Sequence, residues 1–330
     1  MIAYAIAYLT NGQFIGKFFG ANWRWFFWTI FQIGEEEINL IKFIAKFQYL
    51  NVADSKYFFS SNKYYKKRIH SLISKKFLKK IKLKLVLDEL GIEYAKLFNF
   101  EYTRRNRNKK YLSRLLQLSN IGAFYNKCEL VNFIPSFDMK DKEQFTATAR
   151  RFIGIFEING FEYLTYQITN EQDSKYAMSV VYDIQKEKCY KNIIILIDNP
   201  ARININDFAF GLNQVLIITD TEDNREKLKY LNSVNWAKIL DEYYRNKVVL
   251  SEYAFCDYTD YKKAYISYFY FLDTEKVTRI KQFLRENRNK SIDIICDTQL
   301  EKELKKELPT ARYITVNLEE YIDKERNYYD

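Results

Sequence analysis

The feature that most constrains this chain is the uneven distribution of charge along its 330 residues. Residues 35–127 carry 21 Lys and Arg against 8 Asp and Glu, a balance of +13, while residues 128–330 carry 29 basic and 34 acidic side chains. A basic stretch joined to a mildly acidic remainder is typical of a polyanion-binding module attached to a different domain. We therefore predict three parts: an apolar N-terminal segment (1–34), a basic domain (35–127) and a second domain (128–330).

The composition predicts packed domains and no dependence on zinc or disulfides. Hydrophobic residues make up 48% of the chain and aromatic residues 18%, whereas disordered chains are poor in both. The cysteines are too far apart for a Cys-x-x-Cys zinc site or a disulfide framework. They stand at Cys128, Cys189, Cys256 and Cys296. We expect buried, reduced thiols in a cytoplasmic protein without a cofactor.

The apolar N-terminal segment allows several interpretations. Polar residues interrupt residues 1–33, so that no run of about 20 apolar residues could span a membrane. No positive charge precedes Lys17, as it would in a secretory signal. A segment packed on the next domain, an interfacial membrane helix and a partner-binding segment all stay open.

The start of the basic domain predicts three helices. Three glutamates from Glu35 onwards open the first, 35–49, where the helix dipole favours anions. A short second helix fits residues 52–59, and the polar residues 60–62 supply turn and N-cap chemistry. In the third helix, 63–75, apolar side chains recur on one face at helical spacing.

The opposite face of the third predicted helix carries cations and hydroxyl groups, which suits the major groove of DNA. Lys and Arg neutralise phosphates or reach guanine edges, and short polar side chains add hydrogen bonds. The chain's single histidine lies on this face and is expected to contact DNA or to be merely exposed. The candidate DNA-binding residues here are Asn62, Lys63, Tyr64, Lys66, Lys67, Arg68, His70, Ser71 and Ser74.

Residues 77–87 then alternate between apolar side chains and lysines. This period of two predicts a half-buried strand with a cationic outer face. A strand or short hairpin after a recognition helix forms a wing, and a further helix is predicted at 88–98. The order indicates a winged helix-turn-helix that binds duplex DNA, with RNA, another anion or a merely solvated lysine-rich face as alternatives. The added candidates are Lys79, Lys80, Lys82, Lys84, Arg104, Arg105 and Arg107.

Two runs in this domain resemble a known family. Residues 85–94 (LVLDELGIEY) are similar to the Leu-Thr-x-x-Gly-x-x-Tyr stretch that closes the winged helix in the replication-relaxation family of plasmid and conjugative-element proteins. Residues 108–122 are similar to that family's next helix, except that Arg114 stands where a histidine is usual. The resemblance covers residues 35–125. It implies a DNA-binding protein that serves replication, transfer or transcription control on a mobile element.

Beyond Cys128 the pattern changes to strands alternating with helices, which predicts an α/β domain that mediates dimerisation or partner contacts. Asn159–Gly160 is a strong hairpin-turn signal between two strands. The predicted strands are 152–157, 163–168, 192–198, 215–219, 265–272, 291–296 and 313–316. The predicted helices are 173–185, 225–231, 274–286 and 298–308. The chain as a whole is thus expected to be α+β, a winged helix followed by an α/β domain.

The resemblance also implies a nuclease-like core in this second domain. The family's metal-binding acids occur as Pro-Asp before one strand and as Glu-x-Asp or Glu-x-Lys on the next. Here those places read Ala149-Arg150-Arg151 and Tyr166-Gln167-Ile168, so the acids are absent. We predict a degenerate scaffold with no catalytic or metal-binding residues. A metal-dependent nuclease or nickase is the first alternative, and a membrane-associated scaffold that uses residues 1–33 is the second.

Overall fold

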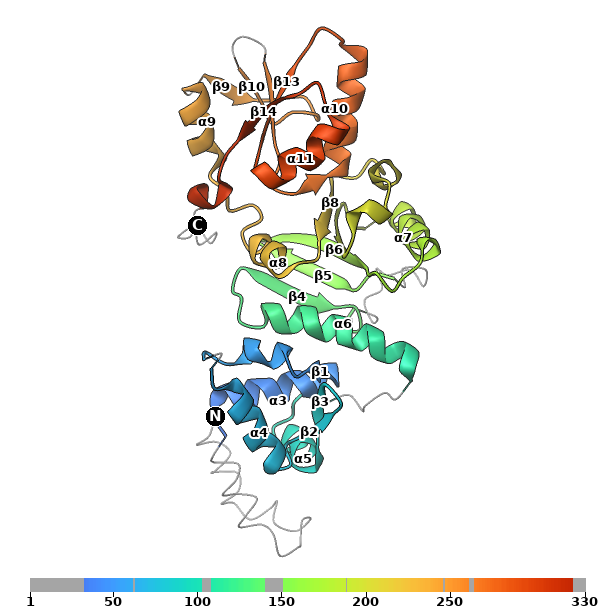
Figure 1. The fold of residues 1–330 in the computed structure, drawn as a ribbon, viewed down its shortest axis with the longest axis vertical. Helices are drawn as coiled ribbons and strands as arrows, with labels where there is room; N and C mark the ends of the chain where they lie inside the picture. The colour runs from blue at the N-terminus through green and yellow to red at the C-terminus, as the bar shows by residue number, and fades with distance from the viewer. Residues whose placement is uncertain are drawn as a thin grey trace, which may run out of the picture. The chain divides into compact units, whose positions relative to one another are not determined.

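The computed structural model describes residues 33–61, 63–102, 108–139, 151–187, 189–245, 247–260 and 264–322. The chain divides into two compact units, residues 1–124 and 125–330. Helices and three β-sheets make up the described residues (Figure 1), so the predicted mixed α+β class is confirmed. The predicted N-terminal segment lies almost entirely outside the described residues, and its interpretation stays a prediction.

Unit 1 combines short helices with a small antiparallel sheet. Its strands are β1 (Leu50–Asn51), β2 (Leu78–Ile81) and β3 (Lys84–Leu87), in the spatial order β1-β3-β2. Its helices are α3 (Glu35–Phe47), the 3-10 helix η2 (Asp54–Phe58), α4 (Tyr65–Ser74), α5 (Glu89–Leu97) and α6 (Lys109–Tyr125), whose last residue belongs to unit 2. The predicted helices are thus confirmed, although the second is a short 3-10 helix.

The first helix begins where its sequence predicts, because the Glu37 side chain accepts a 2.6 Å hydrogen bond from the N–H of Gly34. The core of unit 1 is mainly apolar, with Leu40, Ile41 and Phe58 fully buried. Helix α5 approaches this core closely at Gly91, where a Cβ atom would lie 2.1 Å from the Phe77 carbonyl oxygen. Any side chain at Gly91 would push α5 away from the strands.

Of the two forms predicted for residues 77–87, a strand or a short hairpin, the structure contains the hairpin. The chain reverses at Lys82–Leu83, so that β2 and β3 form an antiparallel hairpin in which Ile81 pairs with Lys84. Leu78 and Leu85 are buried, but Leu83 at the turn is 73% exposed. The alternating pattern showed the extended conformation, but it could not show where the chain turns, because residues on both arms of a hairpin keep the same period.

Unit 2 contains two sheets. The first has the strand order β12-β8-β7-β6-β5-β4, and the second has the order β14-β13-β11-β10-β9. The strands of the first are β4 (Val131–Pro135), β5 (Gly154–Ile158), β6 (Phe161–Ile168), β7 (Asn192–Ile197), β8 (Gln214–Thr219) and β12 (Leu272–Asp273). Those of the second are β9 (Val248–Leu250), β10 (Tyr258–Asp260), β11 (Tyr265–Tyr268), β13 (Ile292–Cys296) and β14 (Arg312–Thr315).

The two sheets share one topology. In each, three consecutive strands form an antiparallel meander, a helix follows, and two further strands continue parallel to the third. The connecting helices are α7 (Ser174–Lys186) in the first sheet and α10 (Thr274–Glu286) with α11 (Thr298–Glu307) in the second. The short strand β12 leaves this pattern and pairs antiparallel with β8 at the edge of the first sheet.

Apolar side chains from both sheets and from α7, α10 and α11 form a common core. Ile193, Ile195 and Ile197 on β7 are almost completely buried, as the unbroken apolar run in the sequence predicts. The helices contribute Val180, Ile184, Val277, Ile280, Leu300 and Leu304.

Most predicted elements of unit 2 are present, and three differences stand out. The segment 265–272 is two strands in different sheets rather than one strand. The helix expected at 225–231 begins earlier, as α8 (Glu222–Leu228), because Thr221 caps it by accepting the N–H of Asn224. The sequence did not predict the elements β4, α9 (Trp236–Tyr244), β9 and β10. Each of these lacks the unbroken apolar run that marks β7 and β8.

Candidate nucleic-acid interface

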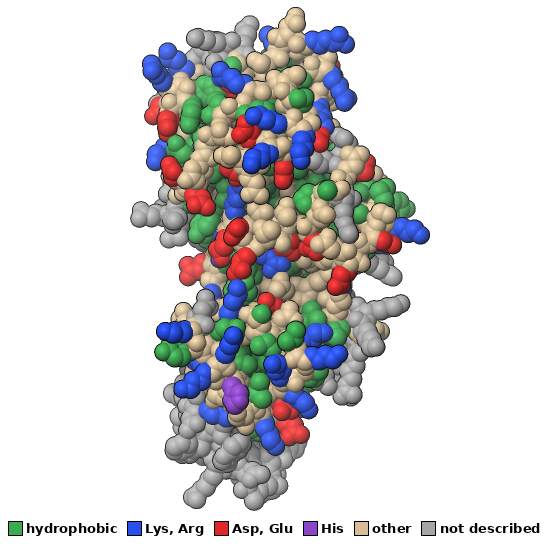
Figure 2. All heavy atoms as spheres, in the orientation of Figure 1, with side chains coloured by type: hydrophobic (Ala, Val, Ile, Leu, Met, Phe, Trp, Pro, Cys, Tyr) green, Lys and Arg blue, Asp and Glu red, His purple; other side chains and the backbone are tan. Residues whose placement is uncertain are grey.

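Helix α4 has one apolar and one cationic face, as the sequence predicts. Ile69 and Leu72 are buried, with exposed fractions of 4% and 2%. Around the rest of the helix and the turn before it, the candidate side chains reach solvent, among them Lys63, Lys66 and Lys67. Figure 2 shows blue Lys and Arg side chains around the purple histidine on one face of unit 1. This face offers an external partner several positive charges.

The β2–β3 hairpin adds a second cationic group. Lys79, Lys80 and Lys82 are exposed, while Lys84 is half-buried beside β1. No ion pair joins the exposed lysines of α4 and the hairpin to a carboxylate among the described residues. These lysines can therefore bind an external anion, although Lys66 Nζ also lies 6.0 Å from the centre of the Tyr65 ring. Phosphate binding by such lysines releases counterions.

Arg68 differs from the lysines around it, and its predicted role needs correction. Its guanidinium pairs with the Glu36 and Glu37 carboxylates at the start of α3, with 3.0 Å between Nε and Glu37 Oε1. It also lies 4.8 Å from the centre of the Phe59 ring. The hydrogen bond with Glu37 raises the pKa of Arg68. Arg68 thus ties α4 to α3, and its charge is already compensated within the protein.

The remaining candidates on α4 and at its N-cap differ in exposure. The Ser74 hydroxyl donates a 3.0 Å hydrogen bond to the carbonyl oxygen of His70, one turn earlier. Ser71 is half-buried, whereas His70 and Tyr64 are exposed. The predicted contacts Asn62, Arg104, Arg105 and Arg107 lie outside the described residues and stay predictions.

Sequence reasoning missed two features of this surface. Leu83 at the hairpin tip was taken as part of the half-buried face of a strand, but it is exposed between two lysines. Lys76, just after α4, is a further exposed cation, with a φ of 59°. A positive-φ position is often marked by Gly or Asn, and here no such residue signals it.

In unit 2, the places that correspond to the nuclease-like signature hold an ion pair and no acidic cluster. Arg151 donates to both carboxylate oxygens of Asp183 at 3.1 Å. Gln167 donates to Asp220 at 2.8 Å, and Tyr166 is fully buried. Among the described residues, no group of three or more His, Cys, Asp or Glu side chains could hold a metal ion.

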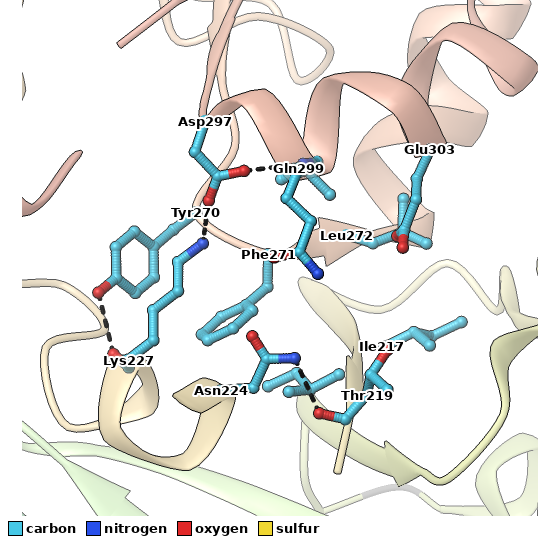
Figure 3. Close-up of a pocket in the computed structure, with 12 residues that line it drawn as sticks. Ile217, Thr219, Asn224, Lys227, Tyr270, Phe271, Leu272, Asp297, Gln299 and Glu303 are labelled. Carbon is cyan, nitrogen blue, oxygen red and sulfur yellow. Dashed lines mark hydrogen bonds and ion pairs between the residues drawn. The ribbon is translucent and has the colours of Figure 1, made fainter. Parts of the chain in front are cut away.

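Unit 2 also contains a small polar pocket, between α8, α11 and the chain before β12 (Figure 3). Its volume of about 30 Å³ holds about two water molecules. Its polar groups are largely paired with one another: Lys227 with Asp297, and Asn224 with the carbonyl oxygen of Thr219 at 2.9 Å. Burial raises the pKa of Glu303, which also lines the pocket.

Two further findings bear on the predictions. No helix within the described ranges combines the length and the apolar character of a membrane span. All four cysteines are free, but only Cys256 and Cys296 are buried, so the expected burial is wrong for Cys128 and Cys189. Comparisons with protein families, with curated proteins and with solved structures found no match to this chain.

Proposed function

We propose that unit 1 is a winged helix-turn-helix module that binds duplex DNA, with α4 as the recognition helix and the β2–β3 hairpin as the wing. The observation that carries this proposal is the set of exposed lysines on both elements that no described carboxylate compensates. They are Lys63, Lys66, Lys67, Lys79, Lys80 and Lys82.

The order of elements in unit 1 supports the proposal. Helix α3, strand β1, the short helix η2, helix α4 and the β2–β3 hairpin follow one another, and β1 joins the hairpin in one sheet. An α-helix is about 10–12 Å wide with its side chains, which fits a major groove about 12 Å wide, and the ten residues of α4 extend about 15 Å along it. The β2–β3 hairpin directly follows α4 in the chain, as the wing follows the recognition helix in a winged helix-turn-helix.

The process that we propose is replication, transfer or transcription control on a mobile element, in the cytoplasm. Its support is the similarity of residues 85–94 and 108–122 to the replication-relaxation family. Gly91 belongs to the first of these runs and is the residue at which α5 can approach Phe77. The role proposed for unit 2 is non-catalytic, because Arg151 and Gln167 stand where that family's acids are expected.

The central experiment measures binding of the full chain to labelled AT-rich and G·C-rich duplexes by fluorescence anisotropy at several salt concentrations. If all six lysines neutralise phosphates, the logarithm of the affinity should fall against that of the salt concentration with a slope of about −5. The double variant Lys63→Glu, Lys67→Glu should bind about a hundredfold more weakly. Arg68 is left unchanged because its loss would separate α4 from α3.

The matched control is Lys302→Glu, which changes an equally exposed lysine on α11 of unit 2. It should bind DNA like the wild type. Binding that is insensitive to salt, absent, or equally weakened by both variants would contradict the proposal. The nuclease alternative makes a separate demand, namely nicking of supercoiled plasmid with Mg²⁺ or Mn²⁺, which we expect not to occur.

For unit 2 we propose pairing with a second copy of this chain through strand β9, at the edge of its sheet. Val249 and Leu250 are 46% and 76% exposed there, and exposed apolar edges favour pairing with another strand. An antiparallel register that sets Val249 opposite Leu250 of the second copy also sets Lys247 opposite Glu252. In this register the edge is complementary to itself in charge.

Sedimentation velocity tests this pairing. The wild type should sediment as a dimer, and Leu250→Lys should sediment as a monomer because two lysines would meet at the centre of the pair. Leu97→Lys, an equally small change at a half-exposed leucine of α5, should leave the dimer intact. A monomeric wild type at micromolar concentration would overturn the proposal.

A further inference from the structure

The turn of the β2–β3 hairpin is built from residues that do not favour it. A two-residue turn needs a positive φ at its first or at both central residues, which Gly, Asn and Asp adopt most readily. Here the first residue is Lys82, with a φ of 56°, and the second is Leu83. The β5–β6 hairpin of the same chain uses Asn159 and Gly160, with φ of 50° and 80°.

This contrast shows that residues 82–83 are not those that best stabilise the turn. A lysine in the left-handed region is strained, and such strain is found mainly where a residue has another role. Leu83 follows with 73% of its surface exposed, and Ile81 before the turn is 38% exposed. The tip therefore presents an apolar side chain directly between two lysines.

The tip is held in place and is not a loose loop. The N–H of Val52, next to β1, donates a 2.9 Å hydrogen bond to the carbonyl oxygen of Leu83. On the other side, the Ile81–Lys84 pair closes the hairpin. An exposed leucine on a fixed backbone loses little conformational freedom when it enters a partner, which favours binding.

We propose that Leu83 is an apolar wedge that enters the minor groove of DNA and partly unstacks one base step, while Lys80 and Lys82 contact the phosphates at its edges. This inference rests on the proposed DNA binding of unit 1. Proteins that insert leucine or a similar side chain between base steps bend the duplex towards the major groove. The apolar tip and its cationic neighbours match the two parts of such a contact.

The dimensions agree with this placement. The four-residue strands of the hairpin extend about 13 Å. When α4 lies in the major groove, the nearest minor groove is half a helical turn away, or about 17 Å. The hairpin and the leucine side chain together can cover that distance.

The wedge also defines the class of DNA that should bind best. Pyrimidine–purine steps such as TA unstack and kink most easily, and the minor groove of A·T-rich DNA has an enhanced negative potential that attracts lysine. The substrate should therefore be A·T-rich duplex with a TA step under the wing. Sequence preference at that step would come from deformability rather than from hydrogen bonds to bases.

The test is end-to-end fluorescence energy transfer on duplexes of equal length, with a central TA step or with a G·C-rich centre. The wild type should bend the TA duplex and bind it about tenfold more tightly than the other. Leu83→Ala should lose the bend and most of that preference but keep the same slope against salt, because every lysine is still present. Leu83→Phe should restore the bend, since phenylalanine is also a wedge.

Leu97→Ala is the matched control, because it shortens a leucine of unit 1 that is 41% exposed but lies on α5. It should bend DNA like the wild type. Salt-dependent binding with a bend that Leu83→Ala leaves unchanged would overturn the wedge but keep the DNA-binding module. An absence of DNA binding by the wild type would overturn both proposals. If Leu83 instead mediates binding to vesicles or to another protein, the wedge is overturned in favour of that partner.

Discussion

The two sheets of unit 2 have the same topology, and the helix and the strand that follow the meander begin 100 residues apart in the two sheets. Asp173 caps α7 and Asp273 caps α10, both helices have 13 residues, and the strands that follow begin at Asn192 and Ile292. In both sheets the helix connects two neighbouring parallel strands. The second sheet therefore repeats the arrangement of the first, although only this helix and this strand keep a spacing of 100 residues.

The repeated positions nevertheless lie in very different surroundings. Asp173 is exposed and accepts one N–H, from Tyr176. Asp273 is 5% exposed, because it belongs to β12, which pairs with β8 of the other sheet. Its Oδ1 accepts the N–H groups of Glu275 and Lys276. The same capping residue therefore terminates a surface helix in one sheet and joins the two sheets in the other.

The largest effect that follows from this difference concerns the two caps. Asp273→Ala should lower the free energy of unfolding by about 3 kcal/mol, because it leaves buried N–H groups without acceptors. Asp173→Ala should lower it by about 1 kcal/mol, as expected for an exposed N-cap. Urea unfolding followed by circular dichroism measures both. Equal losses of unfolding free energy in the two variants would show that the burial of Asp273 contributes nothing to the strength of its cap, and would contradict the difference drawn between the two sheets.

A second pair of positions lies two residues further on. Glu275 is 3% exposed and accepts N–H groups from Phe210 and Leu212, which lie in the loop before β8. Lys175 at the matching place is exposed. Glu275→Ala should destabilise the protein by about 2 kcal/mol because these N–H groups lose a buried acceptor. Lys175→Ala should change stability by less than about 0.5 kcal/mol, as surface substitutions do. Thermal and urea unfolding of the two variants give the values.

A third prediction uses pH to separate the charge of Asp273 from its hydrogen bonds. Burial raises the pKa of Asp273 above its ordinary value of 3.8. The folded state therefore binds this proton more tightly than the unfolded state, and its contribution to stability falls as the pH rises from 3.8 through the raised pKa. Asp273→Asn keeps a capping side chain and removes the charge. The unfolding free energy of this variant should therefore not show the decrease with rising pH that Asp273 causes in the wild type. An unchanged pH profile would contradict the stated cause.

The sequence predicted those elements whose residue pattern is compatible with a single kind of secondary structure. The apolar runs of β7 and β8 must be buried strands, and helix α10 was predicted with its observed ends. The missed strands β9 and β10 have three residues each, which is too short for a period to show. Residues 265–272 contain no Gly or Pro, so nothing in the sequence marks the point where the chain leaves one sheet for the other.

At the candidate interface, the lysines could be predicted and their availability could not. Residue type and helical spacing placed Lys63, Lys67 and Arg68 on one helix. Only the fold shows that Arg68 pairs with Glu36 and Glu37, which lie about 30 residues earlier in the chain. A long-range ion pair depends on how α3 and α4 pack, and a local pattern carries no information about that packing. The same limit hid the exposure of Leu83 at the hairpin tip.

The smallest expected effect concerns thiol reactivity, which distinguishes the two repeats without altering the fold. In the first, Cys189 is exposed in the connection between α7 and β7. In the second, Cys296 is fully buried at the end of β13, and burial raises its pKa to about 12. A thiol reagent such as Ellman's reagent should modify the exposed Cys189 within the time needed to mix the solutions. It should modify Cys296 only after unfolding, because the thiolate is the reactive form. A Cys189→Ser variant identifies the fast reaction. Rapid modification of Cys296 in the folded protein would mean that β13 opens locally, and the second repeat would then be the less stable of the two.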